Sequence, residues 1–472
     1  MLVGRKRELD LLQKYHRSDQ AELVAVYGRR RVGKTYLIRQ AFGDDFFFYF
    51  TGVIGAGKAE QLERFSKALK ACGAGIPDTA GTWMQAFDSL SALIRSSKSK
   101  RKKVIFFDEM PWLDNPKSGF LNAFDYFWNA FASARNDILF IVCGSATSWI
   151  TQNLFRNRGG LHNRVTGKIH LNPFTLHECE AFFKSRNVSL NRYDIIESYM
   201  VFGGIPYYLG YFENNYSLAG NVDNIVFSEN APLKEEFQEL YASLFKKSEH
   251  YTEVVEALSR KTRGMTRDEL VAATKHKNGG TLTKILEDLE LSGFIRKYYA
   301  FPNKVNGALY QLIDSFSLFY FSFMRRVHPT DVHYWTGLRD SPRLNAWRGY
   351  AFELVCFRHI EQIRAGLGIA GVLIGISSWR SRRSDPGAQI DLVIERGDNV
   401  IDLCEIKFSK HPYSIGKGDE EDLRNKLSAF TQETKTRKAV HIAMITTYGV
   451  KQNMHAGIVN SQVTMDALFR PD

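Results

Sequence analysis

GRRRVGKT, residues 28–35, is the stretch that decides the fold of the N-terminal part of the chain. It follows the apolar run ELVAVY at residues 22–27, which favours a β-strand, and precedes YLIRQAF at residues 36–42, whose spacing is helical. Glycines in such a loop let the backbone wrap a phosphate, and amides at the start of the helix donate hydrogen bonds to its oxygens. The stretch therefore predicts a nucleotide-binding loop between a strand and a helix.

The positions of this loop have expected roles at a nucleotide. Lys34 is expected to reach the β and γ phosphates, and the Thr35 hydroxyl to bind Mg²⁺. The pattern indicates a protein that binds ATP together with Mg²⁺. Further contacts to the nucleotide are expected from Gly28, Arg31, Val32 and Gly33.

A second apolar run, at residues 103–107, ends in two acids, Asp108 and Glu109. Open α/β sheets bind ligands at the carboxyl ends of their strands, so these acids are expected beside the loop. Asp108 would hold the Mg²⁺ shell, and Glu109 would polarise the attacking water. A third apolar run, at residues 137–143, is followed by Ser145, a candidate sensor of the γ-phosphate. A serine in an ordinary strand-to-helix turn is the alternative.

Three arginines follow this third run, in a stretch rich in Gly and Asn: Arg156, Arg158 and Arg164. Any of them could act on the phosphate of a neighbouring subunit, which would require a homo-oligomer. Solvated loop arginines are the alternative, and one sequence leaves both open.

Five motifs occur in order along the chain: GRKRE at 4–8, YGRRRVGKT at 27–35, FFDEMPWL at 106–113, CGSA at 143–146 and GGIPYYL at 203–209. This combination resembles the archaeal-type ATPase family of the AAA+ superfamily, in its signalling-type branch, over roughly residues 1–335. The resemblance implies that Gly4 and Arg5 lie near the adenine and that Ser145 is the first sensor. Arg164 is the candidate arginine finger, although this chain departs from the family pattern with Asn163-Arg164 where relatives commonly carry Gly-Arg after the sensor strand.

The middle of the chain is predicted to hold two modules. Residues 171–245 have helical periodicity broken by glycine and proline, which is consistent with a lid of short helices. Residues 246–335 show three helical segments, one opened by a capping box at Thr266, and two short strands, an order typical of a winged helix. Such a module binds DNA or docks proteins, and both alternatives stay open. Phosphate contacts to DNA would come from Lys275, Lys277, Lys284, Arg296 and Lys297.

The C-terminal part, residues 340–472, has a different pattern. GAQIDLVIER, followed by NVIDLCEIKF, predicts a hairpin that brings Asp391 towards Glu405 and Lys407. This spacing resembles the PD-(D/E)xK, or restriction-endonuclease-like, nuclease superfamily, and Glu353 resembles its additional helical acid. Such carboxylates would hold Mg²⁺, and the ammonium would stabilise a hydroxide or the transition state. A hairpin with a solvated salt bridge is the alternative.

Composition narrows the class of protein. The 472 residues exceed what one hydrophobic core supports, and 44% apolar with 24% charged residues is ordinary for a globular protein. No apolar run reaches membrane-spanning length, and charges stand where a signal peptide would be apolar, so a cytoplasmic protein without membrane contact is expected. The formal charge of +12 fits a polyanion partner. Five scattered cysteines argue against a zinc site.

The predicted fold class is therefore α/β. It comprises a P-loop AAA+ sheet domain over residues 1–170, a helical lid over 171–245, a winged-helix domain over 246–335 and a C-terminal α/β restriction-endonuclease-like domain over 340–472. The predicted function is that of an ATP-binding and ATP-hydrolysing protein that acts on nucleic acid, with DNA the expected form, as an ATP-regulated, Mg²⁺-dependent nuclease. The alternative is an ATP-dependent switch or scaffold whose nuclease-like domain binds DNA or protein without cleaving.

Overall fold

The computed structural model describes most of the chain: residues 2–43, 45–73, 79–156, 159–161, 163–302, 307–325, 333–338, 341–381 and 387–471. The chain forms two compact units, Met1–Pro173 and Phe174–Asp472. The further division of the second unit into lid, winged helix and nuclease-like domain stays a prediction. Residues 339 and 340, at the expected start of the last domain, lie outside the described residues.

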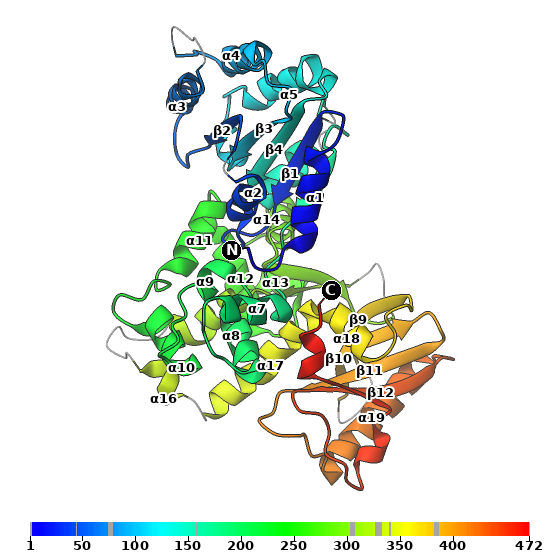
Figure 1. Ribbon diagram of the computed structural model, residues 1–472. Helices are drawn as coiled ribbons and strands as arrows, with labels where there is room; N and C mark the ends of the chain where they lie inside the picture. Colours follow the sequence, from blue (N-terminus) through cyan, green and yellow to red (C-terminus); the bar gives the residue numbers. More distant parts are fainter. Residues whose placement is uncertain are drawn as a thin grey trace. The chain divides into compact units, whose positions relative to one another are not determined.

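A five-stranded parallel sheet with strand order β2-β3-β4-β1-β5 is the centre of the first unit (Figure 1). Its strands are β1 (Glu22–Tyr27), β2 (Phe48–Thr51), β3 (Lys103–Asp108), β4 (Ile138–Gly144) and β5 (Gly167–His170). All residues of β3 and β4 are buried, because helices cover both faces of the sheet. The three strands predicted from the apolar runs are confirmed.

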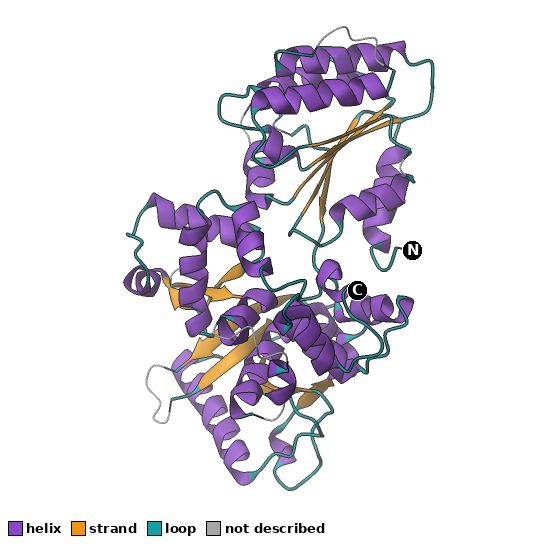
Figure 2. Cartoon of the chain, turned by 90° about the vertical axis from the view of Figure 1, so that its left-hand side faces the viewer, coloured by secondary structure: helices purple, strands orange, loops and turns teal. Residues whose placement is uncertain are grey.

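Helices lie on both faces of this sheet (Figures 1 and 2). On one face are α3 (Lys58–Ala71), α4 (Trp83–Ser96) and α5 (Phe120–Ala130), and on the other are α1 (Lys6–His16) and α2 (Lys34–Phe42). The short helix α6 (Thr147–Ile150) follows β4. An aromatic core that includes Phe65, Phe87 and Phe107 fills the space under α3 to α5. Each fully buried Phe contributes roughly 1.5–3 kcal/mol, which makes the sheet a rigid support for its terminal loops.

The second unit begins with short helices. They are α7 (Leu176–Ser185), α8 (Arg192–Phe202), α9 (Pro206–Leu209), α10 (Leu218–Val222) and α11 (Glu236–Leu244). Three helices follow, α12 (Ser248–Arg260), α13 (Arg267–Ala273) and α14 (Gly280–Leu291). They accompany an antiparallel sheet of order β6-β8-β7, made of Met265–Thr266, Ala308–Leu312 and Ile295–Tyr299. The predicted capping box is present, since Thr266 and Glu269 bond each other's backbone.

Helices α15 (Ser315–Phe319), α16 (Tyr334–Gly337), α17 (Pro342–Arg358) and α18 (Ile360–Gly366) lead to the C-terminal sheet. Its order is β13-β12-β11-β10-β9. The strands are β9 (Ile374–Arg380), β10 (Gln389–Arg396), β11 (Val400–Lys407), β12 (Ala439–Thr446) and β13 (Ser461–Thr464). Helix α19 (Lys417–Thr434) packs on β12, and α20 (Met465–Leu468) follows β13. The predicted β10–β11 hairpin is confirmed.

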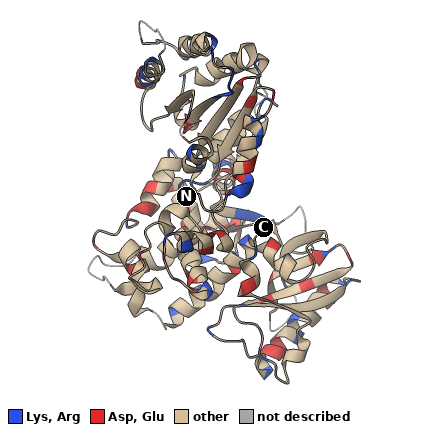
Figure 3. Ribbon diagram, viewed as in Figure 1, with Lys and Arg blue, Asp and Glu red and all other residues tan. Residues whose placement is uncertain are grey.

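Charged residues are spread over both units. Figure 3 shows lysine and arginine interspersed with aspartate and glutamate along the elements of each. Among the described helices, none combines the length and the apolar character needed to cross a lipid bilayer. The net positive charge therefore does not mark one element as the basic surface.

Candidate nucleotide site and acidic cluster

The Lys34 ammonium is held over the loop that precedes α2. It donates hydrogen bonds to the carbonyl oxygens of Gly28 at 3.0 Å and Arg29 at 2.9 Å, and to Ser145 Oγ at 3.0 Å. The side chain is buried, with only 5% of the Lys34 surface exposed. A buried ammonium that is fixed by three acceptors is already in position for an anionic ligand.

Two glycines give the loop its shape. Gly28 has φ +141°, and a Cβ atom there would lie 2.3 Å from the Leu171 carbonyl oxygen, so no other residue fits without moving the backbone. Gly33 has φ +91° and is the N-cap of α2, which presents the first amides of that helix to the loop. The loop thus has the backbone form that the sequence predicted for phosphate binding.

The two acids at the end of β3 join the same network. The Thr35 hydroxyl donates to Asp108 Oδ2 at 2.8 Å, so a hydroxyl and a carboxylate meet where Mg²⁺ is expected. Ser145 binds the Glu109 carboxylate twice, from its backbone N–H at 3.1 Å and from its hydroxyl at 2.7 Å. Lys34, Thr35, Asp108, Glu109 and Ser145 are therefore brought together. Oxygen donors of this kind fit Mg²⁺, which Thr35 and Asp108 would hold.

The other residues expected near the nucleotide differ in their surroundings. Arg5 is buried and donates to the carbonyl oxygens of Asn172 at 2.7 Å and Val32 at 3.5 Å, which ties the N-terminal segment to the loop. Arg31 has a left-handed backbone, with φ +70°. Arg156 and Arg164 are exposed, and Arg158 lies outside the described residues. The role of Arg164 as a finger stays a prediction.

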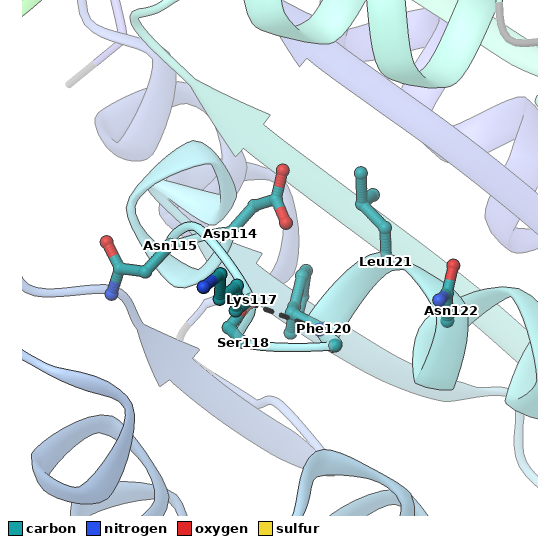
Figure 4. Close-up of a pocket in the computed structure, with 8 residues that line it drawn as sticks. Asp114, Asn115, Lys117, Ser118, Phe120, Leu121 and Asn122 are labelled. Carbon is teal, nitrogen blue, oxygen red and sulfur yellow. Dashed lines mark hydrogen bonds between the residues drawn. The ribbon is translucent and has the colours of Figure 1, made fainter.

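A hollow of about 460 Å³ lies in the same unit, along the segment that connects β3 to α5 (Figure 4). Its lining is Asp114, Asn115, Lys117, Ser118, Gly119, Phe120, Leu121 and Asn122. Asp114 accepts a hydrogen bond from Trp149 Nε1 at 3.0 Å. None of the loop residues 28–35 lines this hollow, so it is separate from the nucleotide site.

A second group of charged residues lies in the C-terminal sheet. The antiparallel register pairs Leu392 with Cys404, so Asp391 and Glu405 stand at adjoining positions of β10 and β11. Lys407 Nζ lies 2.9 Å from Glu405 Oε1. Glu353, from α17, lies close enough for the charges of Asp391, Glu405 and Lys407 to act on it. We call Glu353, Asp391, Glu405 and Lys407 the acidic cluster.

The charges of the acidic cluster shift the pKa values of two of its members. Burial, assisted by the charges of Asp391 and Glu405, raises the pKa of Glu353 to about 8. Burial lowers the pKa of Lys407, but the nearby Glu405 carboxylate outweighs it and leaves the pKa raised. Carboxylates that repel one another in this way are a suitable donor set for Mg²⁺, and Glu353, Asp391 and Glu405 would hold it.

Three ligand atoms of the acidic cluster do not all lie within 4.8 Å of one another. Among the described residues, one group brings three ligand atoms within 4.8 Å of one another, and it is His250, Glu253 and His276. These side chains have other partners: His276 Nε2 lies 3.2 Å from the His250 carbonyl oxygen, and Glu253 accepts from the Lys275 N–H at 2.6 Å. They tie the turn before α14 to α12. Mg²⁺ keeps several waters, so it does not need all three acids of the acidic cluster as direct ligands.

Two residues that contact the acidic cluster were not predicted. Lys426, on α19, lies 2.9 Å from Glu405 Oε2 and is a second cation on that carboxylate. Gln389 donates from Nε2 to Asp391 Oδ1. The sequence pattern could have indicated Gln389, because residues two apart on a strand share a face and Gln389 lies two residues before Asp391. No local pattern identifies Lys426, since its contact depends on how α19 packs.

Replacing Glu353 with glutamine is expected to stabilise the metal-free protein at high pH. Because the folded-state pKa of about 8 lies above the ordinary 4.5, the contribution of Glu353 to stability is fully present below pH 4.5 and is lost as pH rises towards 8. We expect Glu353→Gln to raise the free energy of unfolding by on the order of 2–5 kcal/mol at pH 8, with little change near pH 4.5. Urea unfolding in EDTA at both pH values measures this. The exposed Glu421→Gln is the control, and an equal increment at both pH values would refute the assignment.

Strand β1, the GRRRVGKT loop and helix α2, together with the parallel strand β3 that ends at Asp108 on the far side of β4, form the arrangement of a P-loop nucleotide hydrolase. Residues 2–212 match the model of the family described as "ATPase domain predominantly from Archaea". Over these residues the chain is similar to the archaeal-type ATPase domains of that family. The family match does not extend to the acidic cluster, whose resemblance to nucleases stays a prediction.

One of the relatives found matches most of the chain, and another matches a short part of it. An uncharacterized protein of Methanocaldococcus jannaschii is 23% identical over 415 residues, which cover 86% of this chain and 88% of that protein. An uncharacterized ATP-binding protein of the same organism is 50% identical over 40 residues, or 8% of this chain and 68% of that protein. Among solved structures, the Walker-type ATPase of Pyrococcus abyssi is 16% identical with a TM-score of 0.47, covering 68% of this chain and 96% of that one.

Proposed function

We propose that the first unit uses residues 28–35 to bind ATP with Mg²⁺, and Glu109 to activate the water that attacks the γ-phosphate. The observation that carries this assignment is the hydrogen-bonded chain from Lys34 through Ser145 to Glu109. Thr35 and Asp108 hold the metal, which neutralises charge on the phosphates. Lys34 binds the β and γ phosphates in place of the neutral oxygens that it now contacts.

Ser145 acts as the sensor because its hydroxyl has a single proton. In this structure the hydroxyl accepts from Lys34 and donates to Glu109. It cannot donate to a phosphate oxygen and to Glu109 with the same proton. A bound γ-phosphate that attracts Lys34 and the Ser145 hydroxyl therefore leaves Glu109 Oε1 free to accept from water, while the Ser145 N–H still holds Oε2. Phosphate binding and the availability of the base are linked through one hydroxyl group.

Replacing Glu109 with glutamine tests the ATPase assignment. We expect Glu109→Gln to keep ATP affinity within about threefold and to lower kcat by about 100-fold or more, because an amide cannot accept the proton from water. Phosphate release and the binding of a fluorescent ATP analogue measure the two quantities. Glu63→Gln, an exposed carboxylate of α3, serves as the control. Full turnover by Glu109→Gln would show that another group activates the water.

For the second unit we propose metal-dependent cleavage of nucleic acid, with DNA the expected form. The convergence of Glu353, Asp391, Glu405 and Lys407 from three elements supports this function. The metal supplies Lewis-acid activation of water and of the phosphodiester. Glu353, Asp391 and Glu405 bind and orient it, and the Lys407 ammonium stabilises charge that develops on the phosphate. The preceding module with β6 to β8 would orient the strand, and ATP turnover in the first unit would regulate cleavage.

Incubation of the full chain with single-stranded and duplex DNA and RNA tests this function. We expect fragments of at least one form with Mg²⁺ or Mn²⁺, and none in EDTA, because the acids act through the metal. Each reaction is run with and without ATP, and with Lys34→Ala to separate cleavage from ATP turnover. Intact substrate in every metal and nucleotide condition would contradict cleavage.

One observation favours the second candidate, an ATP-dependent switch or scaffold that binds DNA or protein without cleaving. Lys407 and Lys426 both lie 2.9 Å from Glu405, so that carboxylate is neutralised without a metal. A protein that binds nucleic acid but cleaves none, with ATP-dependent affinity, would match this candidate. The same incubations and a binding titration therefore separate the two functions.

A further inference from the structure

The strand β7 continues towards the C-terminal sheet. Just past its end, Ala300 forms a parallel bridge with Ser378 of β9, and the Phe301 N–H donates to the Ser378 carbonyl oxygen at 2.7 Å. The Phe301 ring lies 5.2 Å from that of Phe430, which belongs to the core of the C-terminal sheet. The module expected to be a winged helix is thus joined to the sheet that carries the acidic cluster, within the same compact unit.

Arg296 of β7 lies against the helix that carries Glu353. Its guanidinium carbon is 3.7 Å from the centre of the Phe357 ring, one helical turn beyond Glu353 on α17. Its Nε donates to Gln311 Oε1 at 2.6 Å, which fixes the plane of the group. Because the guanidinium group is planar, this bond also fixes the directions in which the remaining N–H groups of Arg296 point.

Two arginines of the expected winged-helix module, Arg263 and Arg296, interact electrostatically with members of the acidic cluster. Burial lowers the pKa of Arg296, while the charges of Glu353 and Asp391 are among those that raise it. Arg263, which is exposed, lowers the pKa of Glu353. The Arg263 carbonyl oxygen accepts from the Tyr298 hydroxyl at 2.6 Å, which anchors that turn to β7.

We propose that Arg263 and Arg296 form, together with the acidic cluster, one composite site in which the two arginines bind the phosphate backbone of nucleic acid. The acids alone would repel a polyanion, whereas a guanidinium fork matches phosphate oxygens. The inference deepens the function proposed for the second unit and rests on it. In this proposal the substrate contacts the face of β7 that carries Arg296, rather than the exposed face that carries Lys297. Cleavage would then occur only on a strand that contacts both modules.

Nucleic-acid binding by the full chain tests this proposal. Fluorescence anisotropy of a short labelled DNA, single-stranded and duplex, is measured with Ca²⁺ in place of Mg²⁺ over a series of salt concentrations. We expect Arg296→Gln and Arg263→Gln each to weaken binding about 3- to 10-fold and to reduce the slope of log K against log salt by about 1. Lys297→Gln, an exposed neighbour on β7 whose side chain points to the other face, is the matched control. It should keep the wild-type slope.

The outcomes separate this proposal from nuclease activity. Wild-type slopes in both arginine variants would overturn it, even if the protein cleaves. A loss confined to Lys297→Gln would overturn it as well, because the exposed face would then bind the nucleic acid. Reduced slopes in both arginine variants would support it even if no metal yields cleavage, in which case only the proposed cleavage fails. Because the Arg263 side chain is exposed, Arg263→Gln remains informative if Arg296→Gln does not fold.

Discussion

Lys34→Ala is expected to remove ATP hydrolysis almost completely, with a loss in kcat of about 100- to 1,000-fold and a loss in ATP affinity of at least about tenfold. The ammonium is buried and held by Gly28, Arg29 and Ser145 before any ligand binds, so little reorganisation is needed when a phosphate arrives. Alanine removes the positive charge and also leaves the Ser145 hydroxyl without its donor. Isothermal titration with ATP and a phosphate-release assay measure the two effects.

A lysine outside this network provides the control. Lys67, on α3 of the same unit, is exposed and pairs with Glu63 one turn away. Lys67→Ala is expected to leave ATP affinity and turnover unchanged, because an exposed pair of this kind contributes little. Wild-type ATP affinity in Lys34→Ala would mean that the nucleotide binds elsewhere in the chain.

Lys407→Ala is expected to abolish metal-dependent cleavage, with a loss of at least about 100-fold. The Lys407 ammonium lies beside Glu405 on the same face of β11. In the proposed site it would reach a phosphate oxygen next to the metal. Metal binding should persist, because the carboxylates remain and the change removes a competing cation. Cleavage of a labelled strand with Mn²⁺ and a Mn²⁺ binding titration report on these two properties.

Lys426→Ala separates the chemistry of Lys407 from simple neutralisation of charge. Lys426 is as close to Glu405 as Lys407 is, but it comes from α19 and also pairs with Asp422 at 2.8 Å. If Lys407 acts on the substrate, Lys426→Ala should retain cleavage within about tenfold. Equal losses of cleavage in the two variants would show that both lysines act only as counter-ions of Glu405. Cleavage that survives Lys407→Ala would exclude the proposed mechanism.

The local parts of this fold were readable from the sequence. A strand that ends in glycine, a loop that needs positive φ at Gly28 and Gly33, and a helix that starts at Lys34 are fixed by neighbouring residues. The apolar run before Asp108 and the capping box at Thr266 are signals of the same local kind. Their elements occur where predicted, because backbone geometry and burial periodicity act over a few residues.

Long-range contacts were not readable in the same way. No local signal predicts that the Arg296 side chain packs on Phe357, one helical turn from Glu353. The alternation along β7 separates Arg296 from Lys297 but does not reveal which face meets another sheet. Lys426 illustrates the same limit, because its distance to Glu405 depends on the packing of α19 against β12.

The bridge between Ala300 and Ser378 has a consequence for how the C-terminal sheet can exist by itself. Strand β9 is the last strand of that sheet, and Ala300 and Phe301 occupy part of its outer edge. A fragment that starts near residue 340 would leave this edge without a neighbour and would expose the Phe430 ring where Phe301 now packs. Unpaired edges of this kind invite aggregation. Expression fragments should therefore begin ahead of β7, and recombination between relatives would be tolerated poorly inside the segment from β7 to β9.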